Sequence, residues 1–429
     1  MSLSPLPVYA DACGWNALLP PRPPRPPAQG DIRVKYAVVG AGYTGLAAAR
    51  RLAELDPQAE IAVLEGTTVG EGSSARNSGF ATRFDAKVGL SPKEAARAEQ
   101  LNRFTGEGFD YLLAGMAAGG FSCDLEETGR ILGAATEAGE AKVRELIDGA
   151  AAQGVAARLL DRAGVAALTG TTYYRSGART ESGYLLQPAA LIRGLADALP
   201  AGVRLYETSP VEAIEEGRPR LLRTPQARIR AECVVLATNA AIKHFGVWRD
   251  GLVTIYTYAG LTEPIAPERQ ERLGAAAWGL LPAHRLGSTL RRVGADRLMI
   301  RSLYAYEWPI DSRAAAQALK ARFDRRYPEL ADVRLQYVWG GTTALTMNGS
   351  PRWGRIGEGL YGSAGCNGAG IVKGTVLGKR LAEMIVTGDA QEALQSAYGR
   401  ADRIAPEPFR TIGFRLVSAI ESRKAGAEM

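Results

Sequence analysis

Three glycines and one acidic residue have the types and spacing of a dinucleotide site. Gly40, Gly42 and Gly45 form a GxGxxG pattern, and Glu65 follows twenty residues after the last glycine. The first glycine allows a tight turn, the second lets the backbone approach a pyrophosphate, and the third lets a helix pack closely on a strand. A carboxylate at Glu65 can accept hydrogen bonds from ribose hydroxyls and disfavours a 2′-phosphate. These residues predict that the chain binds the ADP half of NAD or FAD.

The elements around these glycines are the ones that such a site requires. The run YAVVG (36–40) is a continuous apolar stretch typical of a buried parallel strand, and residues 44–55 carry apolar side chains at helical spacing. The run EIAVLEG (60–66) is a second buried strand that ends at the acid. Strand, helix and strand in this register predict a βαβ unit, in which the helix N-terminus supplies donors and a positive field to an anion.

The segments that follow favour FAD over NAD. The loop GTTVGEGSSARNSGF (66–80) combines small residues, hydroxyls, amides and one guanidinium, which can lie against an extended ligand and hold its diphosphate. An ordinary surface loop is the alternative. The run VVLATNA (234–240) predicts a buried strand that ends in Thr238 and Asn239, and GSAGCNGAG (362–370) opens a helix. The backbone donors of that helix can stabilise electron density on a flavin.

Taken in order with GYLLQPAALIRGL (183–195), YVWGGTTALTMNGSPRWGRIG (337–357) and YGSAGCNGAGIVKGTVLGKRLAE (361–383), these motifs resemble the D-amino-acid oxidase, glycine oxidase and sarcosine oxidase superfamily. Within it, the chain is most similar to bacterial gamma-glutamylputrescine oxidoreductases. The resemblance runs from about residue 31 to the C-terminal region. It implies a FAD site formed by Gly40, Gly42, Tyr43, Thr44, Gly45, Glu65, Gly66, Ser73, Ser74, Arg76, Asn77, Ser78, Gly79, Val211, Thr238, Asn239, Gly341, Gly365, Asn367, Gly368, Ala369, Gly370 and Ile371.

The resemblance also implies the fold class, which is α/β with an α+β substrate part. A Rossmann-like FAD-binding domain is expected from segments 31–90, 183–243 and 337–390, interleaved with an antiparallel-sheet substrate domain from 91–182 and 244–336. We expect a C-terminal helical segment over 391–429. Residues 1–30 contain the run PPRPPRPP, which fixes φ and removes donors, so an extended polyproline-like tether is expected there.

A flavin can accept a hydride from a carbon that bears an amine, leaving an imine that water hydrolyses. We therefore expect an enzyme that oxidises the C–N bond of a small primary or secondary amine or amino acid, with O2 or a quinone as electron acceptor. A general base is not obligatory, and the two histidines, His244 and His284, are interpreted as structural or surface residues rather than catalytic ones. The substrate-pocket candidates are Tyr256, Tyr258, Arg301, Tyr304, Tyr306 and Trp339. For each aromatic residue core packing is the alternative, and for Arg301 the alternatives are binding of a carboxylate or phosphonate and an outward-facing strand position.

The sequence departs from the sarcosine-oxidase pattern GxxGHGFK, because it reads GCNGAGIVK. Ala369 replaces the histidine, Val372 takes the lysine position, and Lys373 lies about 100° further around a helix. N-methylglycine is therefore not a safe choice of substrate. The 339–357 segment carries no cysteine, so we expect non-covalent FAD, and Cys366 is interpreted as a small residue in a tight turn.

Composition bounds the remaining interpretations. No window reaches the roughly 20 apolar residues of a membrane span, and the N-terminus does not resemble a secretory signal, so we expect a cytoplasmic protein. The four cysteines form no CxxC pair, no metal site is expected, and an NAD(P)H-dependent reductase with a redox pair is disfavoured. The net charge of +7 is scattered, which makes nucleic acid an unlikely partner. A tRNA-modifying flavoprotein and a non-catalytic flavin-binding subunit stay as alternatives, and the oligomeric state is open.

Overall fold

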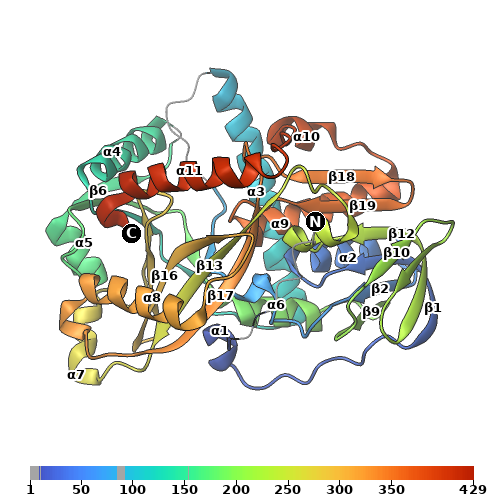
Figure 1. Cartoon of the computed structure of the whole chain (residues 1–429), viewed down its shortest axis with the longest axis horizontal. Coiled ribbons are helices and arrows are strands. Elements are labelled where there is room, and N and C mark those ends of the chain that lie inside the picture. The colour runs from blue at the N-terminus through green and yellow to red at the C-terminus, as the bar shows by residue number, and fades with distance from the viewer. Residues whose placement is uncertain (1–8, 10, 85–91, 153) are drawn as a thin grey trace.

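A computed structural model describes residues 9, 11–84, 92–152 and 154–429. Its first sheet contains the predicted βαβ unit (Figure 1). The sheet runs in the order β10-β11-β12-β1-β2-β9, and β18 and β19 extend it beside β12. The parallel strands are β1 (Gly30–Val39), β2 (Ile61–Leu64), β9 (Val203–Tyr206), β12 (Ala227–Leu236) and β19 (Leu360–Ala364). The antiparallel strands are β10 (Ala213–Glu215), β11 (Arg220–Arg223) and β18 (Arg352–Gly357).

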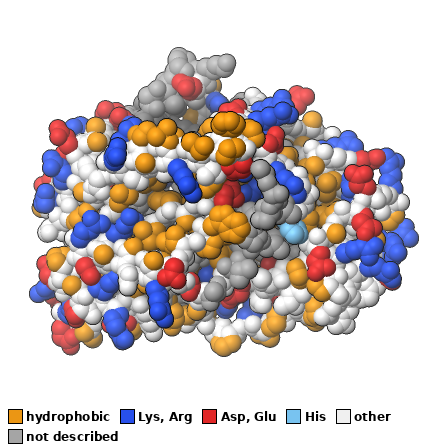
Figure 2. Space-filling view, viewed as in Figure 1, with side chains coloured by type: hydrophobic (Ala, Val, Ile, Leu, Met, Phe, Trp, Pro, Cys, Tyr) orange, Lys and Arg blue, Asp and Glu red, His pale blue; other side chains and the backbone are white. Residues whose placement is uncertain are grey.

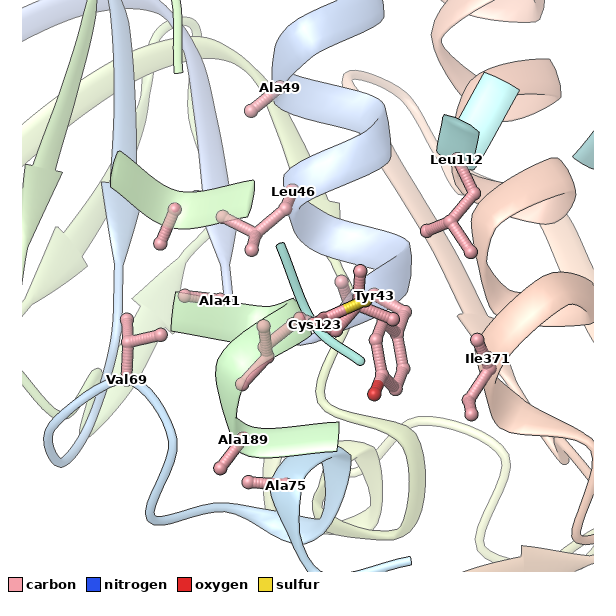
Figure 3. Packing of buried hydrophobic residues seen from close by; sticks show 14 of the residues in the cluster. Ala41, Tyr43, Leu46, Ala49, Val69, Ala75, Leu112, Cys123, Ala189 and Ile371 are labelled. Carbon is pink, nitrogen blue, oxygen red and sulfur yellow. The ribbon is translucent and has the colours of Figure 1, made fainter. Parts of the chain in front are cut away.

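Two helices that begin at the same edge of the first sheet pack closely together. They are α2 (Tyr43–Leu55), which follows the glycine turn, and α9 (Gly370–Thr387), which follows β19. A Cβ on Gly378 would lie 2.1 Å from the backbone oxygen of Thr44, so only glycine permits this separation. Figure 3 shows the buried core at the start of these helices, where Tyr43 points between Cys123 and Ile371.

The second sheet is mostly antiparallel, as expected for the substrate part. Its order is β17-β13-β16-β15-β14-β5-β7-β6, with one parallel pair, β14 and β5. The strands are β17 (Leu335–Leu345), β13 (Val253–Thr262), β16 (Arg297–Tyr306), β15 (Thr289–Val293), β14 (Gly279–Pro282), β5 (Arg130–Ala134), β7 (Ser176–Thr180) and β6 (Ala157–Asp161). The combination confirms the predicted fold class.

Helices cover both sheets. The longer ones are α3 (Pro92–Gly119), α4 (Glu137–Ala152), α6 (Pro188–Asp197), α8 (Ser312–Arg326) and α11 (Phe409–Ala425), and the shorter ones are α1 (Gly14–Ala17), α5 (Arg162–Thr169), α7 (Pro267–Gln270) and α10 (Glu392–Tyr398). A small sheet joins β3 (Phe80–Ala81), β8 (Tyr184–Leu185) and β4 (Glu126–Glu127). Among the described helices, none is long and apolar enough to cross a bilayer.

Two features differ from the expected domain organisation. First, β17 falls in the segment predicted for the FAD domain, yet it is the edge strand of the second sheet. Second, the Pro-rich segment is extended but is fixed to the body. Trp15 is 1% exposed and its indole N–H donates to the Asn77 carbonyl oxygen at 2.8 Å, while Arg22 pairs at 2.9 Å with the fully buried Glu207. Trp15 precedes the prolines and Arg22 stands between two of them, and their contacts cannot be read from the composition. The rest of the domain division stays a prediction.

We expect Gly378→Ala to lower the free energy of unfolding by about 1–3 kcal/mol, because its new methyl group would collide with backbone that cannot rotate away. Gly413→Ala is the matched control. Gly413 lies in the second turn of α11, and a Cβ there would meet nothing within 4 Å. This second substitution should be neutral or stabilise by about 0.4–1 kcal/mol. Urea unfolding of both variants measures the difference, and equal stabilities would contradict the close packing of α2 on α9.

Candidate cofactor and substrate site

The glycine turn lies where β1 ends and α2 begins. Gly40 has a φ of +101°, and a Cβ on Gly45 would lie 1.9 Å from the carbonyl oxygen of Gly40. A Cβ on Gly42 would lie 2.8 Å from the Ser74 hydroxyl oxygen, so the second predicted segment packs against the first. Gly42 is also the N-cap of α2 and has no side-chain cap, which leaves first-turn N–H groups available to an anion.

Glu65 lies directly after β2 and beside this turn. Its carboxylate accepts a hydrogen bond from the Ala41 N–H at 2.9 Å and from a second backbone N–H at 3.1 Å. The Ser209 N–H donates to the Glu65 carbonyl oxygen at 2.8 Å, which brings the chain at 208–211 alongside and places the buried Val211 at the same edge as Gly66. The acid, the turn and this apolar side chain are therefore brought together as predicted for an adenosine site.

The loop 72–79 is held by its own polar side chains. The Tyr43 hydroxyl donates to the Ser74 carbonyl oxygen at 2.9 Å, and burial raises the pKa of Tyr43 above its usual value. The Asn77 amide donates to the same oxygen at 2.6 Å and accepts from the Gly79 N–H at 2.8 Å. Gly79 has a φ of +72°, and any Cβ there would collide with the Leu186 carbonyl oxygen. The loop is thus held in this conformation by contacts within the protein.

Arg76 is buried and makes its contacts within the protein. Its buried guanidinium donates to the carbonyl oxygens of Glu71 at 2.8 Å, Gly340 at 3.2 Å and Asp11 at 3.1 Å. It also lies over the ring of Tyr9, with the two centres 4.4 Å apart. Arg76 therefore holds the loop against β17 and the N-terminal segment, and its contact with a diphosphate stays a prediction.

Thr238 and Asn239 lie at the carboxyl end of β12, as predicted. The Thr238 hydroxyl oxygen is buried and, within the described part of the chain, has no hydrogen-bond partner. The Asn239 amide oxygen accepts from the Gly365 N–H at 3.0 Å, and its nitrogen lies 3.3 Å from the Cys366 sulfur. That sulfur lies 3.1 Å from the Thr343 hydroxyl of β17. An orphaned buried hydroxyl beside the glycine turn fits a dinucleotide, which would supply the missing partner.

The turn before α9 is shaped for backbone contact with a ligand. Asn367 and Gly368 have φ values of +53° and +83°. The Asn367 amide accepts from the Thr346 N–H at 2.9 Å and donates to the Gly365 carbonyl oxygen at 2.8 Å, so it fixes the turn. A Cβ on Gly368 would meet no atom within 4 Å, and the N-cap Ala369 gives α9 no side-chain cap. The N–H groups at the start of α9 therefore remain available to a flavin.

Side chains along the first turn of α9 point in two directions. Gly370 begins the helix, and Ile371 and Val372 are buried in the core. The Lys373 ammonium donates to the Gly349 carbonyl oxygen at 3.3 Å, on the outer side of the helix. Lys373 therefore does not replace the lysine of the sarcosine-oxidase pattern.

A β-bulge in β16 decides which face of the second sheet carries the polar candidates. Ser302 pairs with Tyr258, but Tyr304 pairs with Thr257, so Leu303 is an extra residue and has a φ of +65°. Without it, Arg301 and Tyr304 would lie on opposite faces. With it they share one face, and the Arg301 guanidinium donates to the Tyr304 hydroxyl at 2.7 Å.

This face is the one that meets the first sheet. On the same face of β13 and β16, Ala259 and Met299 belong to the same core cluster as Val38 of β1. Gly341 and Thr343 of β17 lie on the same face by their pairing with β13, next to the turn before α9. Arg301, Tyr304 and Tyr306 thus lie on the side of the sheet where a flavin ring held by the glycine turns would be.

Three of the pocket candidates are buried in hydrophobic cores. Tyr256 and Tyr258 do share one face, but that face packs under α8 in a separate core with Ile300. Burial raises the pKa of Tyr256 to about 12, and the Tyr258 hydroxyl accepts from the Ile310 N–H at 2.7 Å. Trp339 is 0% exposed and lies 6.2 Å from the Trp15 ring. Core packing is therefore the role that these contacts support for all three residues. Thr342, which pairs with Tyr256, lies 2.8 Å from the Ser73 hydroxyl of the predicted cofactor loop, so the part of Tyr256 in a substrate pocket stays a prediction.

The two histidines have local partners. The His284 Nδ1 accepts from the Leu286 N–H at 3.2 Å, and its Nε2 lies 3.5 Å from Glu421 of α11. The ring of His244 packs edge-on against Phe245. Among the described residues, no group of three or more His, Cys, Asp or Glu side chains could hold a metal ion.

Sequence reasoning missed two residues that support the site. Arg291 is 6% exposed and donates to the carbonyl oxygens of Ser78 at 2.9 Å and Leu186 at 2.8 Å, and burial lowers its pKa to about 10. The Tyr9 hydroxyl lies 2.6 Å from the Ser73 hydroxyl, which places the N-terminal segment on the loop 72–79. Arg291 stands next to Arg292 in the strand sequence TLRRV, so neither it nor Tyr9 has a local sequence signal that points to this role.

Comparison with known proteins agrees with this arrangement. The chain belongs to the family described as FAD dependent oxidoreductase (DAO), which matches residues 35–384. It is therefore a FAD-dependent oxidoreductase. It is 26% identical to the gamma-glutamylputrescine oxidoreductase of Escherichia coli (strain K12) over 369 residues, 84% of this chain and 85% of that protein. The probable oxidoreductase OrdL of Haemophilus influenzae is 26% identical over 383 residues, 85% of each chain.

Solved structures establish the fold. Glycine oxidase from Geobacillus kaustophilus matches with a TM-score of 0.71 at 20% identity, over 83% of this chain and 95% of that one. L-amino acid deaminase from Proteus myxofaciens in complex with anthranilate matches with a TM-score of 0.67 at 16% identity, over 89% of this chain and 95% of that one.

We expect Glu65→Ala to weaken FAD binding by roughly 10- to 100-fold, because a hydrogen bond to a charged group contributes about 1.5–3 kcal/mol. Glu60→Ala is the control, since Glu60 lies just before β2 at its other end, is 58% exposed and pairs only at the surface with Arg204. Titration of the apoprotein with FAD, followed by flavin fluorescence, measures both affinities. Equal affinities for the two variants would contradict the ribose-binding role of Glu65.

Proposed function

We propose that this enzyme oxidises the C–N bond of a small primary or secondary amine or amino acid. The observation that carries the proposal is the pair of Arg301 and Tyr304, which the bulge turns onto the face next to the cofactor segments. Within the described part of the chain, Arg301 forms no ion pair, so its guanidinium is available to a substrate carboxylate or phosphonate. The relatives named above for amine and amino-acid substrates support the same class of reaction.

Arg301, Tyr304 and Tyr306 would each have a separate role in such a reaction. When bound, FAD would supply the hydride acceptor for oxidation of the amine to an imine, which water would hydrolyse to a carbonyl compound and an amine or ammonia. Arg301 would hold the anionic tail, and Tyr304, whose hydroxyl donates to the Arg285 carbonyl oxygen at 2.7 Å, would fix the guanidinium. Tyr306, stacked on Phe414 at 4.3 Å, would form an apolar wall. Their contribution is positioning and exclusion of water.

Several finer features are part of the proposal. The FAD is held without a covalent bond, since β17 carries hydroxyl side chains and no cysteine. The electron acceptor is O2 or a quinone, and the protein acts in the cytoplasm. Of the residues in the proposed FAD site, those of the glycine turn, Glu65, the Thr238 hydroxyl and the start of α9 have the strongest support from geometry.

Anaerobic mixing of the FAD-loaded protein with amines, amino acids, N-methylated amines and aminophosphonates tests the reaction. We expect one class to bleach the flavin absorbance near about 450 nm, because two-electron reduction removes that band. Readmission of air then distinguishes O2 from a quinone as the acceptor. Bleaching by none of these compounds would contradict the proposal and favour a modified tRNA substrate or a non-catalytic subunit.

We expect Arg301→Gln to raise KM for substrates with an anionic tail by roughly 10- to 100-fold, through loss of a charged hydrogen bond, with a smaller effect on kcat. Arg297→Gln is the control, because Arg297 lies at the other end of β16 and donates to Gln336. Steady-state kinetics with a tailed substrate and its neutral analogue measure the effect. The same loss with both substrates would show that Arg301 does not bind the tail.

A further inference from the structure

The outer face of α11 is the main exposed apolar surface of the described chain. Of the ten large apolar residues that are exposed, five lie on this helix. They are Phe409 at 67%, Ile412 at 60%, Leu416 at 62%, Val417 at 51% and Ile420 at 43%. Figure 2 shows a row of hydrophobic side chains along the helix that Figure 1 labels α11.

The spacing of these residues places them on one side of the helix. Phe409, Ile412, Leu416 and Ile420 are separated by three or four residues, so they form a stripe along about three turns. Gly413 lies within the stripe, where a Cβ would meet no atom within 4 Å. We call these five apolar residues and Gly413 the α11 stripe. An apolar stripe of this kind is normally buried against a partner.

The opposite side of α11 is fixed to the body. Phe414 stacks on Tyr306, and Glu421 pairs with Arg285 at 3.0 Å. Near the start of the helix, Arg410 pairs with Glu407 at 2.8 Å. These contacts fix the inner face of α11. A rotation of the helix about its axis that buried the α11 stripe would therefore break them.

The charges around the α11 stripe distinguish between two candidate partners, a second copy of this chain and an anionic surface. Glu421 is the single acidic residue of α11, all of which is described, and its side chain is 19% exposed on the inner side. Arg415, Arg423 and Lys424 are exposed beside the stripe. The whole chain has a net charge of +7. A second copy would bring cations against cations, whereas an anionic surface would be attracted to all of them.

We infer that the α11 stripe docks on an anionic lipid surface. A helix with Phe, Leu and Ile on one face and flanking Arg and Lys residues lies in the plane of a membrane interface, with the apolar side chains among the acyl chains and the cations at the headgroups. The docking is peripheral, and it refines the cytoplasmic location proposed above to the inner face of a membrane. It does not depend on which amine is oxidised.

Co-sedimentation of the FAD-loaded full chain with lipid vesicles tests this inference. The vesicles are phosphatidylcholine alone or phosphatidylcholine mixed with phosphatidylglycerol. We expect binding to the mixed vesicles, and a loss of at least about tenfold in partitioning for Leu416→Gln combined with Ile420→Gln, since two buried apolar side chains are removed. Arg423→Gln with Lys424→Gln should lower binding by about fivefold per cation. Leu159→Gln, at a residue of β6 that is 60% exposed, is the matched control and should bind as the unmodified chain does.

Three outcomes would overturn the inference. One is the absence of binding to the mixed vesicles, and another is equal binding by the double variant at Leu416 and Ile420. The third is a dimer in light scattering that this double variant converts to a monomer, which would assign the α11 stripe to a second copy. Retained FAD absorbance and an unchanged urea midpoint show that each variant is folded.

Discussion

The close packing of α2 against α9 is the constraint on which the cofactor site depends. Both helices start at the carboxyl edge of the first sheet, and glycine at 378 lets their backbones approach through Thr44. Two uncapped helix N-termini are therefore held side by side, each preceded by a glycine-containing turn. Their partial positive charges point to one region, which can accommodate a diphosphate at one helix and the pyrimidine side of a flavin at the other. A wider separation of α2 and α9 would divide this region into two separate ones.

The second sheet must bring polar side chains to that region, and a single extra residue achieves it. Strand alternation places Tyr256, Tyr258 and Ser302 under α8, so a regular β16 would have placed Tyr304 there as well. The bulge at Leu303 reverses the alternation for the rest of the strand. Tyr304 and Tyr306 then join Arg301 on the cofactor side, and the cost is one non-glycine residue with a positive φ.

The sequence predicted the parts of the site that depend on local pattern. The glycine turn, Glu65 and the strand end at Thr238 follow from βαβ geometry, and the structure brings them together. The pocket side was harder to predict, because strand alternation gives the relative faces of Tyr256 and Tyr258 but not which face is covered by a helix. Bulges have no reliable local signal, so the positions of Tyr304 and Arg301 required the pairing register. Contacts such as that of Trp15 with Asn77 join distant segments and are not visible in either one alone.

The inner and outer sides of α11 link the proposed substrate site to the proposed lipid surface. Phe414 covers Tyr306, and Glu421 reaches Arg285, whose carbonyl oxygen orients Tyr304. The helix is thus a cover over the substrate face as well as the carrier of the α11 stripe. Docking on a lipid surface would hold this cover from its outer side. Without docking, the helix is held by a few contacts along its inner side. Docking also bears on the electron acceptor. A quinone dissolved in a bilayer would meet the protein through the docked side, next to the residues that line the proposed substrate face.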